Sequence, residues 1–283
     1  MYEGHTMKIE LAESYGCCFG VKRAIKIAEE NKNSATYGPL IHNPNEIERL
    51  KRDFNVALSD NLESFQTGDT AVIRTHGIPK QELAQLHERK VNVIDATCPY
   101  VTKPQQICEE MSSQGYDIVI FGDEEHPEIK GVKSYAADKV YVVNSPEEID
   151  KLALREKVAV VAQTTRRIED YQSIVSKLMM THKEVRVFNT ICNATFDNQD
   201  AVYKLARDAD VMIVIGGQNS SNTKQLHSIA LDVCSSSYHI ESEEDLMPQW
   251  FEGKKFCGIS AGASTPDWII QAVLDRIKAL AKD

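Results

Sequence analysis

Three cysteines occupy equivalent places in the sequence, each after a short apolar run and before a segment with helical spacing. They are one of the adjacent pair Cys17-Cys18, then Cys98, and then Cys192, and they lie roughly 80–95 residues apart. The sequence has no CxxC pair, so the ligand spacing of zinc ribbons is absent. Thiolates suit soft metal centres, and a structural iron–sulfur cluster usually takes four of them. Three converging thiolates would therefore hold a cluster with one iron left open for a ligand.

The remaining cysteines differ from these three in their surroundings. Cys17 directly precedes Cys18 and could be a fourth ligand. Adjacent residues seldom both reach one small cluster, so we expect only one of the pair to bind. Cys108, Cys234 and Cys257 fall within or beside apolar patterns. We interpret these three as small core residues, because buried positions are common for cysteine.

Polar turns follow several of the expected strands and recur at similar distances from each cysteine. They supply hydrogen-bond donors, namely His42, His76, His126, Ser220, Ser221, Asn222 and Ser264. Backbone N–H groups and the helix dipole at such turns favour anions, phosphate above all. Histidine adds positive charge near neutral pH when an anion raises its pKa. Any one of these turns could be an ordinary strand–helix connection, but their repetition favours a site for a small phosphorylated ligand.

Two further polar residues could take part in proton transfer. Glu128 follows His126-Pro127, and in a closed cavity beside an anion its carboxyl group would have a raised pKa and could donate a proton. Alternatively it is an exposed surface residue that continues the acidic run 123–125. Thr164 could place its hydroxyl against a substrate oxygen. Its alternative role is that of a helix N-cap.

Strands alternate with helical patterns along the chain, which is typical of an α/β protein with mostly parallel sheets. The clearest strands are expected at 8–12, 71–74, 91–95, 117–121, 140–143, 158–162, 185–189, 211–215 and 256–260. Ligands of open α/β sheets collect beyond the carboxyl ends of the strands, where the cysteines and polar turns lie. Three strand–helix units of this kind, arranged around an axis, would direct their cysteines and polar turns at one central cavity.

Composition excludes several classes of protein. The chain has 283 residues, a net charge of −10 and 42% hydrophobic residues, which is ordinary for a soluble globular protein. This acidic balance argues against a nucleic-acid or anionic-membrane surface. We find no apolar run long enough to span a membrane and no secretory signal in the first ten residues. The sequence thus predicts a cytoplasmic protein with reduced thiols.

Nine short motifs together resemble one family, the 4-hydroxy-3-methylbut-2-enyl diphosphate reductases or LytB proteins. In chain order they are residues 16–24 (GCCFGVKRA), 41–43 (IHN), 75–77 (THG), 95–99 (DATCP), 126–128 (HPE), 163–165 (QTT), 191–195 (ICNAT), 219–222 (NSSN) and 261–264 (AGAS). Each motif alone is weak, but nine in order cover nearly the whole chain. One departure is Cys17, where the family usually has an aromatic residue; the spacing to Gly20-Val21 favours Cys18 as the ligand.

The resemblance implies a trefoil of three α/β lobes with pseudo-threefold symmetry around a central cluster cavity. We assign residues 14–97 to lobe 1, 98–191 to lobe 2, and 192–283 with 1–13 to lobe 3. It implies a 4Fe-4S cluster held by Cys18, Cys98 and Cys192, whose open iron is easily lost to give 3Fe-4S. The implied diphosphate ligands are His42, His76, His126, Ser220, Asn222 and Ser264, with Ser221 beside them. Glu128 is implied to deliver protons, and Thr164 to hydrogen-bond the substrate hydroxyl.

The implied reaction is the last step of the non-mevalonate isoprenoid pathway. Two electrons and two protons remove an allylic hydroxyl as water and leave isopentenyl and dimethylallyl diphosphates. The sequence has no flavin or nicotinamide fingerprint, so a flavodoxin or ferredoxin is expected to supply the electrons. Two other hypotheses fit three thiols and an open iron. One is an iron–sulfur hydro-lyase of the aconitase kind, which consumes no electrons, and the other is a non-catalytic cluster-bearing sensor.

Overall fold

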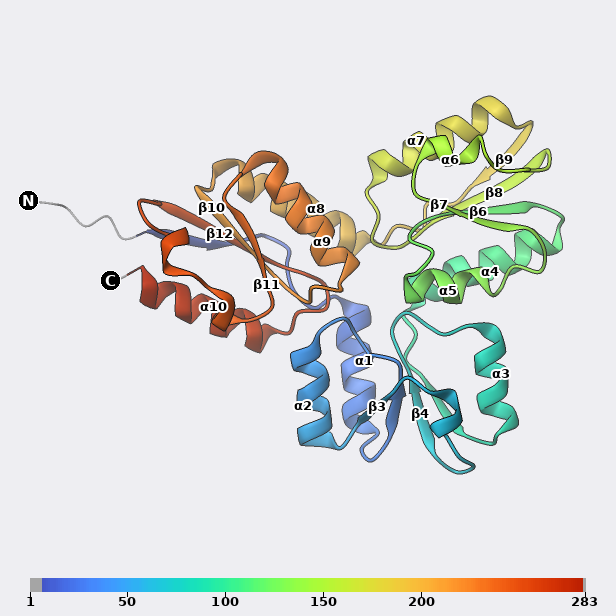
Figure 1. Cartoon of the computed structure of the whole chain (residues 1–283), viewed down its shortest axis with the longest axis horizontal. Coiled ribbons are helices and arrows are strands. Elements are labelled where there is room, and N and C mark those ends of the chain that lie inside the picture. The colour runs from blue at the N-terminus through green and yellow to red at the C-terminus, as the bar shows by residue number, and fades with distance from the viewer. Residues whose placement is uncertain (1–6, 282–283) are drawn as a thin grey trace, which may run out of the picture. The chain divides into compact units, whose positions relative to one another are not determined.

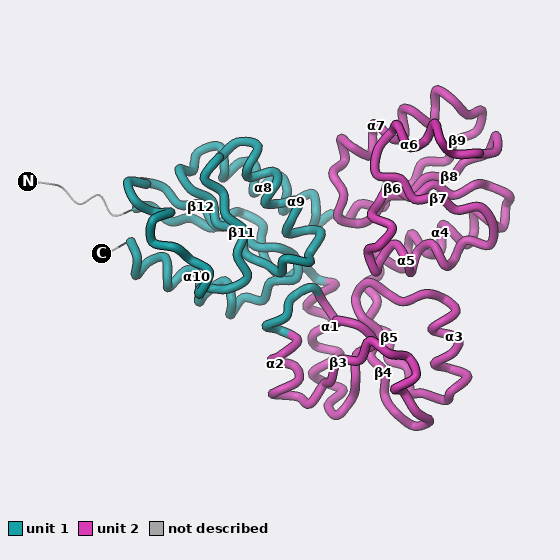
Figure 2. Tube along the Cα trace, viewed as in Figure 1, with its two compact units in different colours: residues 1–19, 42–46, 193–283 teal, residues 20–41, 47–192 magenta. Residues whose placement is uncertain are grey.

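The computed structural model describes residues 7–281, in which strands and helices alternate along the chain (Figure 1). The described strands form three four-stranded sheets, and all neighbouring strands in them are parallel. The chain falls into two compact units, which Figure 2 shows in different colours. Unit 1 contains residues 7–19, 42–46 and 193–281 of the described chain, and unit 2 contains residues 20–41 and 47–192. The predicted α/β class with parallel sheets is confirmed.

Unit 1 has one sheet with helices on both faces. The strand order is β1 (Lys8–Leu11), β12 (Phe256–Ala261), β10 (Val211–Ile215) and β11 (Ser237–Ile240). Alternate residues of β10 pack on α10 (Asp267–Leu280) and on the pair α8 (Asn193–Asp208) and α9 (Ser221–Val233). Every residue of β10 is therefore buried, which explains its uninterrupted apolar sequence. Two short 3₁₀ helices, Glu243–Asp245 and Pro248–Trp250, complete this unit.

The first sheet of unit 2 is built from short strands. Its order is β3 (Ala57–Ser59), β2 (Ala35–Tyr37), β4 (Thr70–Ile73) and β5 (Asn92–Asp95). The helices of this part of the chain are α1 (Phe19–Glu30), α2 (Pro44–Phe54) and α3 (Lys80–Glu88), with a 3₁₀ turn at Leu62–Ser64. Leu86 of α3 packs with Ile73 and Phe65 in a common core. This core fixes the carboxyl end of β4, from which one predicted histidine loop leaves.

The second sheet of unit 2 has the order β7 (Val140–Val143), β6 (Asp117–Phe121), β8 (Lys157–Ala162) and β9 (Glu184–Val187). Its helices are α4 (Pro99–Ser113), α5 (Pro127–Lys133), α6 (Pro146–Ile149) and α7 (Ile168–Thr181). Ile118 and Ile120 of β6 pack with α4 and α5. Phe121 of the same strand stacks on Tyr171 of α7, with ring centroids 6.2 Å apart. Both faces of this sheet are thus covered, which holds the loops at its carboxyl edge in place.

All nine predicted strands are present, within one or two residues at their ends. Three strands were not predicted: β2, β3 and β11 have only three or four residues each, too few to show a period. The interpretation of Cys108, Cys234 and Cys257 as core residues is confirmed, because all three are buried. Burial raises the pKa of both Cys108 and Cys257 to about 12. None of the described helices is long and apolar enough to cross a membrane.

Candidate active site

The loop after β4 carries His76 and lies against the turn that carries Cys98. Thr75 donates its N–H to the carbonyl of Leu40 at 3.1 Å, and its own carbonyl accepts the N–H of Cys98 at 3.0 Å. These bonds tie the ends of β2, β4 and β5 together. His76 directly follows Thr75. The segments that carry His76 and Cys98 are therefore neighbours at the carboxyl edge of this sheet.

Glu128 is the acidic residue of the predicted site, and it is buried. It lies in the first turn of α5, and only 1% of its surface is exposed. Thr164, which follows β8, donates its N–H to one carboxylate oxygen at 2.7 Å and its hydroxyl to the other at 2.6 Å. Burial raises the pKa of Glu128, and the two bonds from Thr164 oppose that rise. The buried alternative for Glu128 is therefore the one observed.

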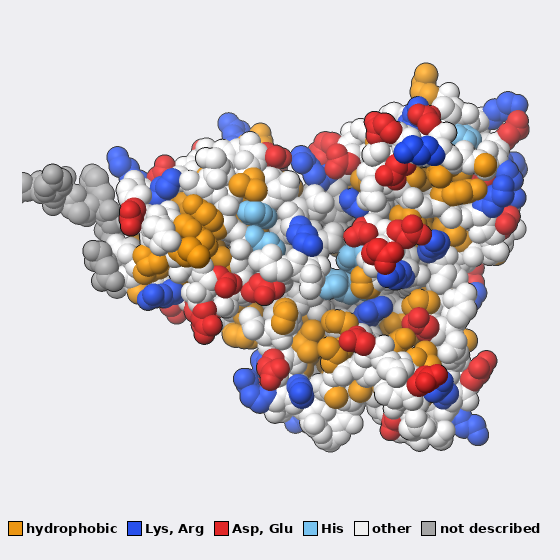
Figure 3. Space-filling model, in the orientation of Figure 1, with side chains coloured by type: hydrophobic (Ala, Val, Ile, Leu, Met, Phe, Trp, Pro, Cys, Tyr) orange, Lys and Arg blue, Asp and Glu red, His pale blue; other side chains and the backbone are white. Residues whose placement is uncertain are grey.

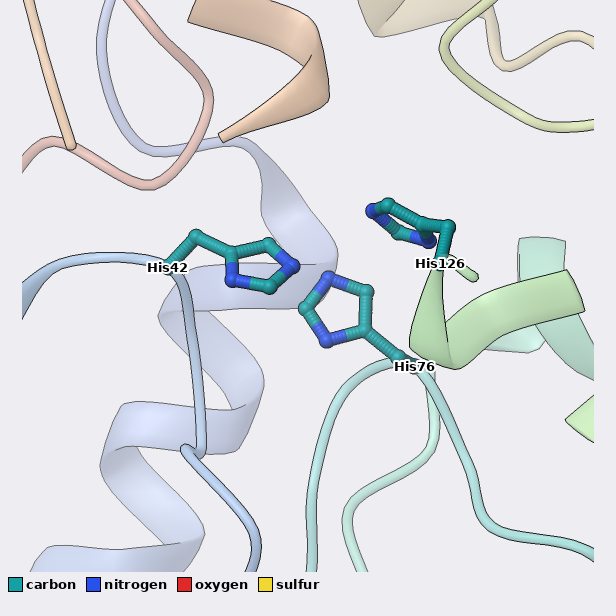
Figure 4. Close-up of side chains that lie close together, drawn as sticks. All are labelled: His42, His76 and His126. Atoms are coloured by element: carbon teal, nitrogen blue, oxygen red, sulfur yellow. The ribbon is translucent and has the colours of Figure 1, made fainter. Parts of the chain in front are cut away.

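His126 contacts both Glu128 and His76. It is the N-cap of α5, and its ring nitrogen Nδ1 accepts the N–H of Glu128 at 3.2 Å. Its ring meets that of His76 edge to face, with centroids 5.3 Å apart and an interplanar angle of 83° (Figure 4). The backbone carbonyl of Thr164 accepts the N–H of Cys192 at 3.0 Å. Unit 2 thus links six predicted residues through short contacts: His76, Cys98, His126, Glu128, Thr164 and Cys192.

The structure corrects the alternative role of Thr164. Helix α7 begins at Ile168 with Arg167 as its N-cap, so Thr164 lies before the helix and does not cap it. Its hydroxyl and its N–H are both directed to Glu128 instead. The neighbouring Gln163 is buried, and its side-chain oxygen accepts the N–H of Asp123 at 2.9 Å. This bond holds the β6–α5 turn, and hence the start of α5, against the end of β8.

Unit 1 places Cys18 beside the loop that follows β12. Gly16 donates its N–H to Ala261 at 2.9 Å, and Cys18 donates its N–H to Ala263 at 3.2 Å. Gly16 has φ +73°, a conformation that only glycine adopts without strain. The next residue of the β12 loop is Ser264. Cys18 and this serine, which were predicted to lie at one site, therefore stand on segments joined by backbone hydrogen bonds.

A second loop of unit 1 connects β10 to α9 and carries the predicted anion ligands. Ser220 caps α9, and its hydroxyl oxygen accepts the N–H of Thr223 at 3.2 Å. Asn222 is 4% exposed, and neither its amide oxygen nor its amide nitrogen has a hydrogen-bond partner among the described residues. A buried amide without partners is costly, so it indicates a position kept for a ligand. No acidic residue lies in the first turn of α9, which leaves its positive dipole end available to an anion.

His42 lies two residues before the start of α2, and within unit 1 its backbone lies close to Gly217 in the loop after β10. A Cβ atom on Gly217 would lie 2.3 Å from the backbone carbonyl oxygen of His42. Only glycine permits this approach. On the other side of the loop, His239 of β11 bonds the carbonyl of Gly216 through Nε2 at 2.8 Å. Burial lowers the pKa of His239, which favours the neutral ring in this contact.

We expect Gly217→Ala to weaken diphosphate binding, because the added methyl group pushes the His42 backbone away from the β10–α9 loop. Gly131→Ala is the matched control, since a Cβ there meets its nearest atom at 3.5 Å, an ordinary contact. Calorimetric titration with inorganic diphosphate should show at least about a tenfold loss of affinity for the first variant, which corresponds to about 1.4 kcal/mol. Equal affinity of both variants would contradict the role of this close approach.

Sequence reasoning did not find Gly217 or His239. Gly216-Gly217 was visible as a dipeptide after a strand, which signals a close backbone approach, but its partner His42 is 175 residues away in the sequence. His239 lies in β11, a strand too short to predict. Both residues shape the loop that carries Ser220, Ser221 and Asn222, and neither is expected to touch a ligand.

The predicted thiols suit an anionic metal cluster by their place in the fold. Cys18, Cys98 and Cys192 each directly precede a helix, and α1, α4 and α8 have no acidic residue in their first turns. Helix N-termini stabilise negative charge, so these positions suit an anionic cluster. All three cysteines are partly exposed, in contrast to the three core cysteines. Cys17 is also partly exposed, so exposure alone does not separate it from Cys18.

Comparisons with known proteins agree with the resemblance. The LytB protein family model matches residues 9–278. The 4-hydroxy-3-methylbut-2-enyl diphosphate reductase of Sulfurimonas denitrificans is 68% identical and covers 96% of this chain and 99% of its own. That of a Sulfurovum species is 64% identical and covers 97% of this chain and its own full length.

Two solved structures share the fold over nearly the whole chain. One is (E)-4-hydroxy-3-methyl-but-2-enyl diphosphate reductase, described as the terminal enzyme of the non-mevalonate pathway, with 45% identity and a TM-score of 0.71 over 96% of this chain and 99% of that one. The other is the corresponding reductase of Plasmodium falciparum, with 26% identity and a TM-score of 0.90 over 95% of this chain and 87% of that one. With the family match and these identities, the chain belongs to the LytB protein family.

Proposed function

We propose that this chain is a 4-hydroxy-3-methylbut-2-enyl diphosphate reductase that acts in the last step of the non-mevalonate pathway. Two electrons and two protons are consumed, and the allylic C–O bond breaks. The hydroxyl oxygen leaves as water with one proton, and the other proton forms a C–H bond on the allylic fragment. The products are isopentenyl and dimethylallyl diphosphates. The observation that carries the proposal is the contact of Thr164 with both oxygens of the buried Glu128, beside His126 and the Cys192 turn.

The diphosphate is bound by neutral or partly protonated donors in this proposal. The ligands are His42, His76, His126, Ser220, Ser221, Asn222 and Ser264. The two unpartnered atoms of the Asn222 amide and the helix start at Ser220 support it in unit 1, and the paired rings of His76 and His126 support it in unit 2. An anchored diphosphate fixes the reacting end of the substrate, which lowers the entropy cost of the reaction.

The proposed cofactor is one 4Fe-4S cluster held by Cys18, Cys98 and Cys192, with one iron open and 3Fe-4S as its oxidised form on isolation. When bound, such a cluster supplies electrons one at a time and a Lewis acid for the substrate oxygen. The proposal includes the trefoil of three lobes, 14–97, 98–191 and 192–283 with 1–13, around this cofactor. It is supported by the position of each thiol immediately before a helix whose first turn has no acidic residue.

Glu128 holds and moves the proton. Because burial raises its pKa, it remains protonated at higher pH than an exposed glutamate, and it can give the proton to the departing hydroxyl oxygen. Thr164 keeps the carboxyl group in one orientation through two bonds and can turn its hydroxyl to the same substrate oxygen. Turnover should therefore fall as the pH rises through the pKa of Glu128.

The electron donor is proposed to be a flavodoxin or a ferredoxin, and the setting to be the cytoplasm, where thiols remain reduced. All seven cysteines are thiols in the structure, which supports this setting. On the face drawn in Figure 3, acidic and basic side chains are interspersed. The net charge of −10 supports the proposal that neither nucleic acid nor an anionic membrane is a partner.

Asn222→Ala should separate binding from stability. Removing an amide that has no partner leaves no new unsatisfied group, so we expect the thermal midpoint of the ligand-free protein to change little. A lost hydrogen bond to a charged ligand costs about 1.5–3 kcal/mol, so the affinity for diphosphate should fall about 10- to 100-fold. Calorimetry and thermal unfolding of the same samples measure both. A strongly lowered midpoint with unchanged affinity would make Asn222 a structural residue.

An anaerobic assay with reduced viologen tests the proposed activity directly. The reductase oxidises two equivalents of one-electron donor for each diphosphate product, as the electron balance above requires. A hydro-lyase would convert substrate without viologen, and a sensor would convert none. Either result would overturn the proposed function.

A further inference from the structure

Residues 42–46 form a short segment of unit 1, although the chain on either side of it belongs to unit 2. The segment carries His42, a proposed diphosphate ligand, and the first turn of α2. Asn43 is buried, and its side-chain oxygen accepts the N–H of Glu46 at 3.1 Å. This bond satisfies one of the N–H groups that a helix start leaves open, so it fixes the path of the chain from His42 into the helix.

Glu46 connects this segment to the rest of unit 1. It is buried, with 1% of its surface exposed, and its Oε2 atom accepts the indole N–H of Trp268 at 3.0 Å. Trp268 lies in the first turn of α10, 222 residues further along the chain. Hydrogen bonds to a carboxylate are stronger than those between neutral groups, and a buried group that loses its partner is costly. The bond is therefore a firm link between the starts of α2 and α10.

The two linked residues stand at matching distances from two proposed diphosphate ligands. Glu46 is the fourth residue after His42, and Trp268 is the fourth residue after Ser264. In both places the ligand precedes the helix and the linked residue lies in its first turn. The bond thus joins the two segments of unit 1 within one helical turn of each ligand.

Both segments are also held by other contacts over the few residues between the ligand and the bond. Thr265, which directly follows Ser264, is buried and donates its hydroxyl to the carbonyl of Ile215 at the end of β10, at 3.0 Å. In the other segment, the close approach of Gly217 limits where the backbone of His42 can lie. A shift of either helix start would therefore be passed on to the ligand before it.

We propose that Glu46 and Trp268 are a positioning pair for the diphosphate, whose bond holds the His42 segment and the Ser264 segment at the separation that one anion requires. This inference rests on the proposed function, and it assigns no contact with the substrate to either residue. Without the bond, part of the binding free energy is consumed in ordering the two ligands. The pair should therefore act on diphosphate binding and not on the chemical step.

Trp268→Phe tests the inference, because it removes the indole N–H and keeps an aromatic ring. Trp268 is 47% exposed, so the smaller ring leaves no buried cavity and the chain should fold. Calorimetry of the anaerobically purified chain with inorganic diphosphate should show an affinity about three- to tenfold lower, the loss expected for one hydrogen bond. In the viologen assay KM should rise by a similar factor, with kcat changed less than about twofold.

Trp250→Phe is the matched control, because it makes the same substitution at the other tryptophan of the chain. The ring of Trp250 stacks on that of Tyr238, with centroids 3.9 Å apart, and phenylalanine can keep this contact. The control should bind diphosphate as the unmodified chain does.

Variants of Glu46 separate this bond from the other surroundings of the residue. Glu46→Gln keeps an oxygen that can accept the indole N–H, so its affinity for diphosphate should stay within about twofold of the unmodified chain. Glu46→Leu removes the acceptor and should cost at least as much affinity as Trp268→Phe. The double variant Glu46→Leu/Trp268→Phe should lose less binding free energy than the sum of the two single losses, because both substitutions remove the same bond.

Thermal unfolding of the same samples separates positioning from stability alone. Unchanged diphosphate affinity in Trp268→Phe would overturn the inference, whether or not its thermal midpoint falls. Strictly additive losses in the double variant would also overturn it, because the two residues would then act separately. Failure of the unmodified chain to bind diphosphate or to reduce the substrate would instead refute the proposed function, so the two failures are distinguishable.

Discussion

Replacing Glu128 by glutamine should reduce turnover about 10²- to 10⁴-fold while the fold and diphosphate binding persist. Glutamine keeps the size of the side chain and can still accept the bond from Thr164, but it has no acidic proton to give. The carboxyl group is held by two hydrogen bonds from Thr164, and glutamine fills the same space. The substitution therefore changes the chemistry of the group and leaves its packing in place. The measurement is kcat with reduced viologen, together with the affinity for inorganic diphosphate.

Two controls separate proton delivery from positioning at this site. Glu128→Asp keeps the acid but shortens its reach to Thr164, so it should keep more activity than glutamine. Thr164→Val removes one of the two bonds and should cost less turnover than Glu128→Gln. Normal turnover of Glu128→Gln would end the assignment of this residue as the proton donor.

Replacing any one of Cys18, Cys98 or Cys192 by serine should remove the iron and abolish turnover. Serine is a poor ligand for a soft metal centre, and a cluster left with two thiolates would be lost. Each of the three cysteines bonds a neighbouring loop through its backbone N–H, which a serine retains, so the local fold should survive. The measurement is iron and sulfide per chain after anaerobic purification, with the folded fraction followed by circular dichroism.

Cys17→Ser is the informative control, because Cys17 and Cys18 are adjacent and both partly exposed. We expect this variant to keep its iron and its turnover. Loss of iron in Cys17→Ser with normal iron in Cys18→Ser would exchange the assignments of the two residues. If Cys17→Ser and Cys18→Ser both kept their iron, neither cysteine alone would be a required ligand.

The candidate site residues could be selected from the sequence because they stand at the carboxyl ends of parallel strands, where residue type alone is informative. The burial of Glu128 could not be predicted, because it depends on Thr164, which lies 36 residues further along the chain. The acidic run 123–125 before it is exposed, as a surface interpretation expects, but Glu128 turns inward with Ile129. Local sequence therefore left two interpretations open that only the tertiary contact separates.

Other features were missed because they too depend on contacts between segments that are far apart in the sequence. The close approach of Gly217 to His42 joins two segments that no local pattern connects. The short strands β2 and β3 are held by pairing with β4 and with each other, and their own sequences are too short to reveal them. Fold class follows from many residues at once, whereas these features each depend on a single distant contact.

Mössbauer spectroscopy of the anaerobically purified chain, with and without the diphosphate substrate, tests the central claim most directly. The claim is that three cysteines hold a cluster whose remaining iron meets the substrate. It predicts about four irons and about four sulfides per chain, with one iron distinct from the others and only that signal changed by the substrate. A chain without iron, or a cluster whose irons are all alike and unaffected by the substrate, would contradict the claim.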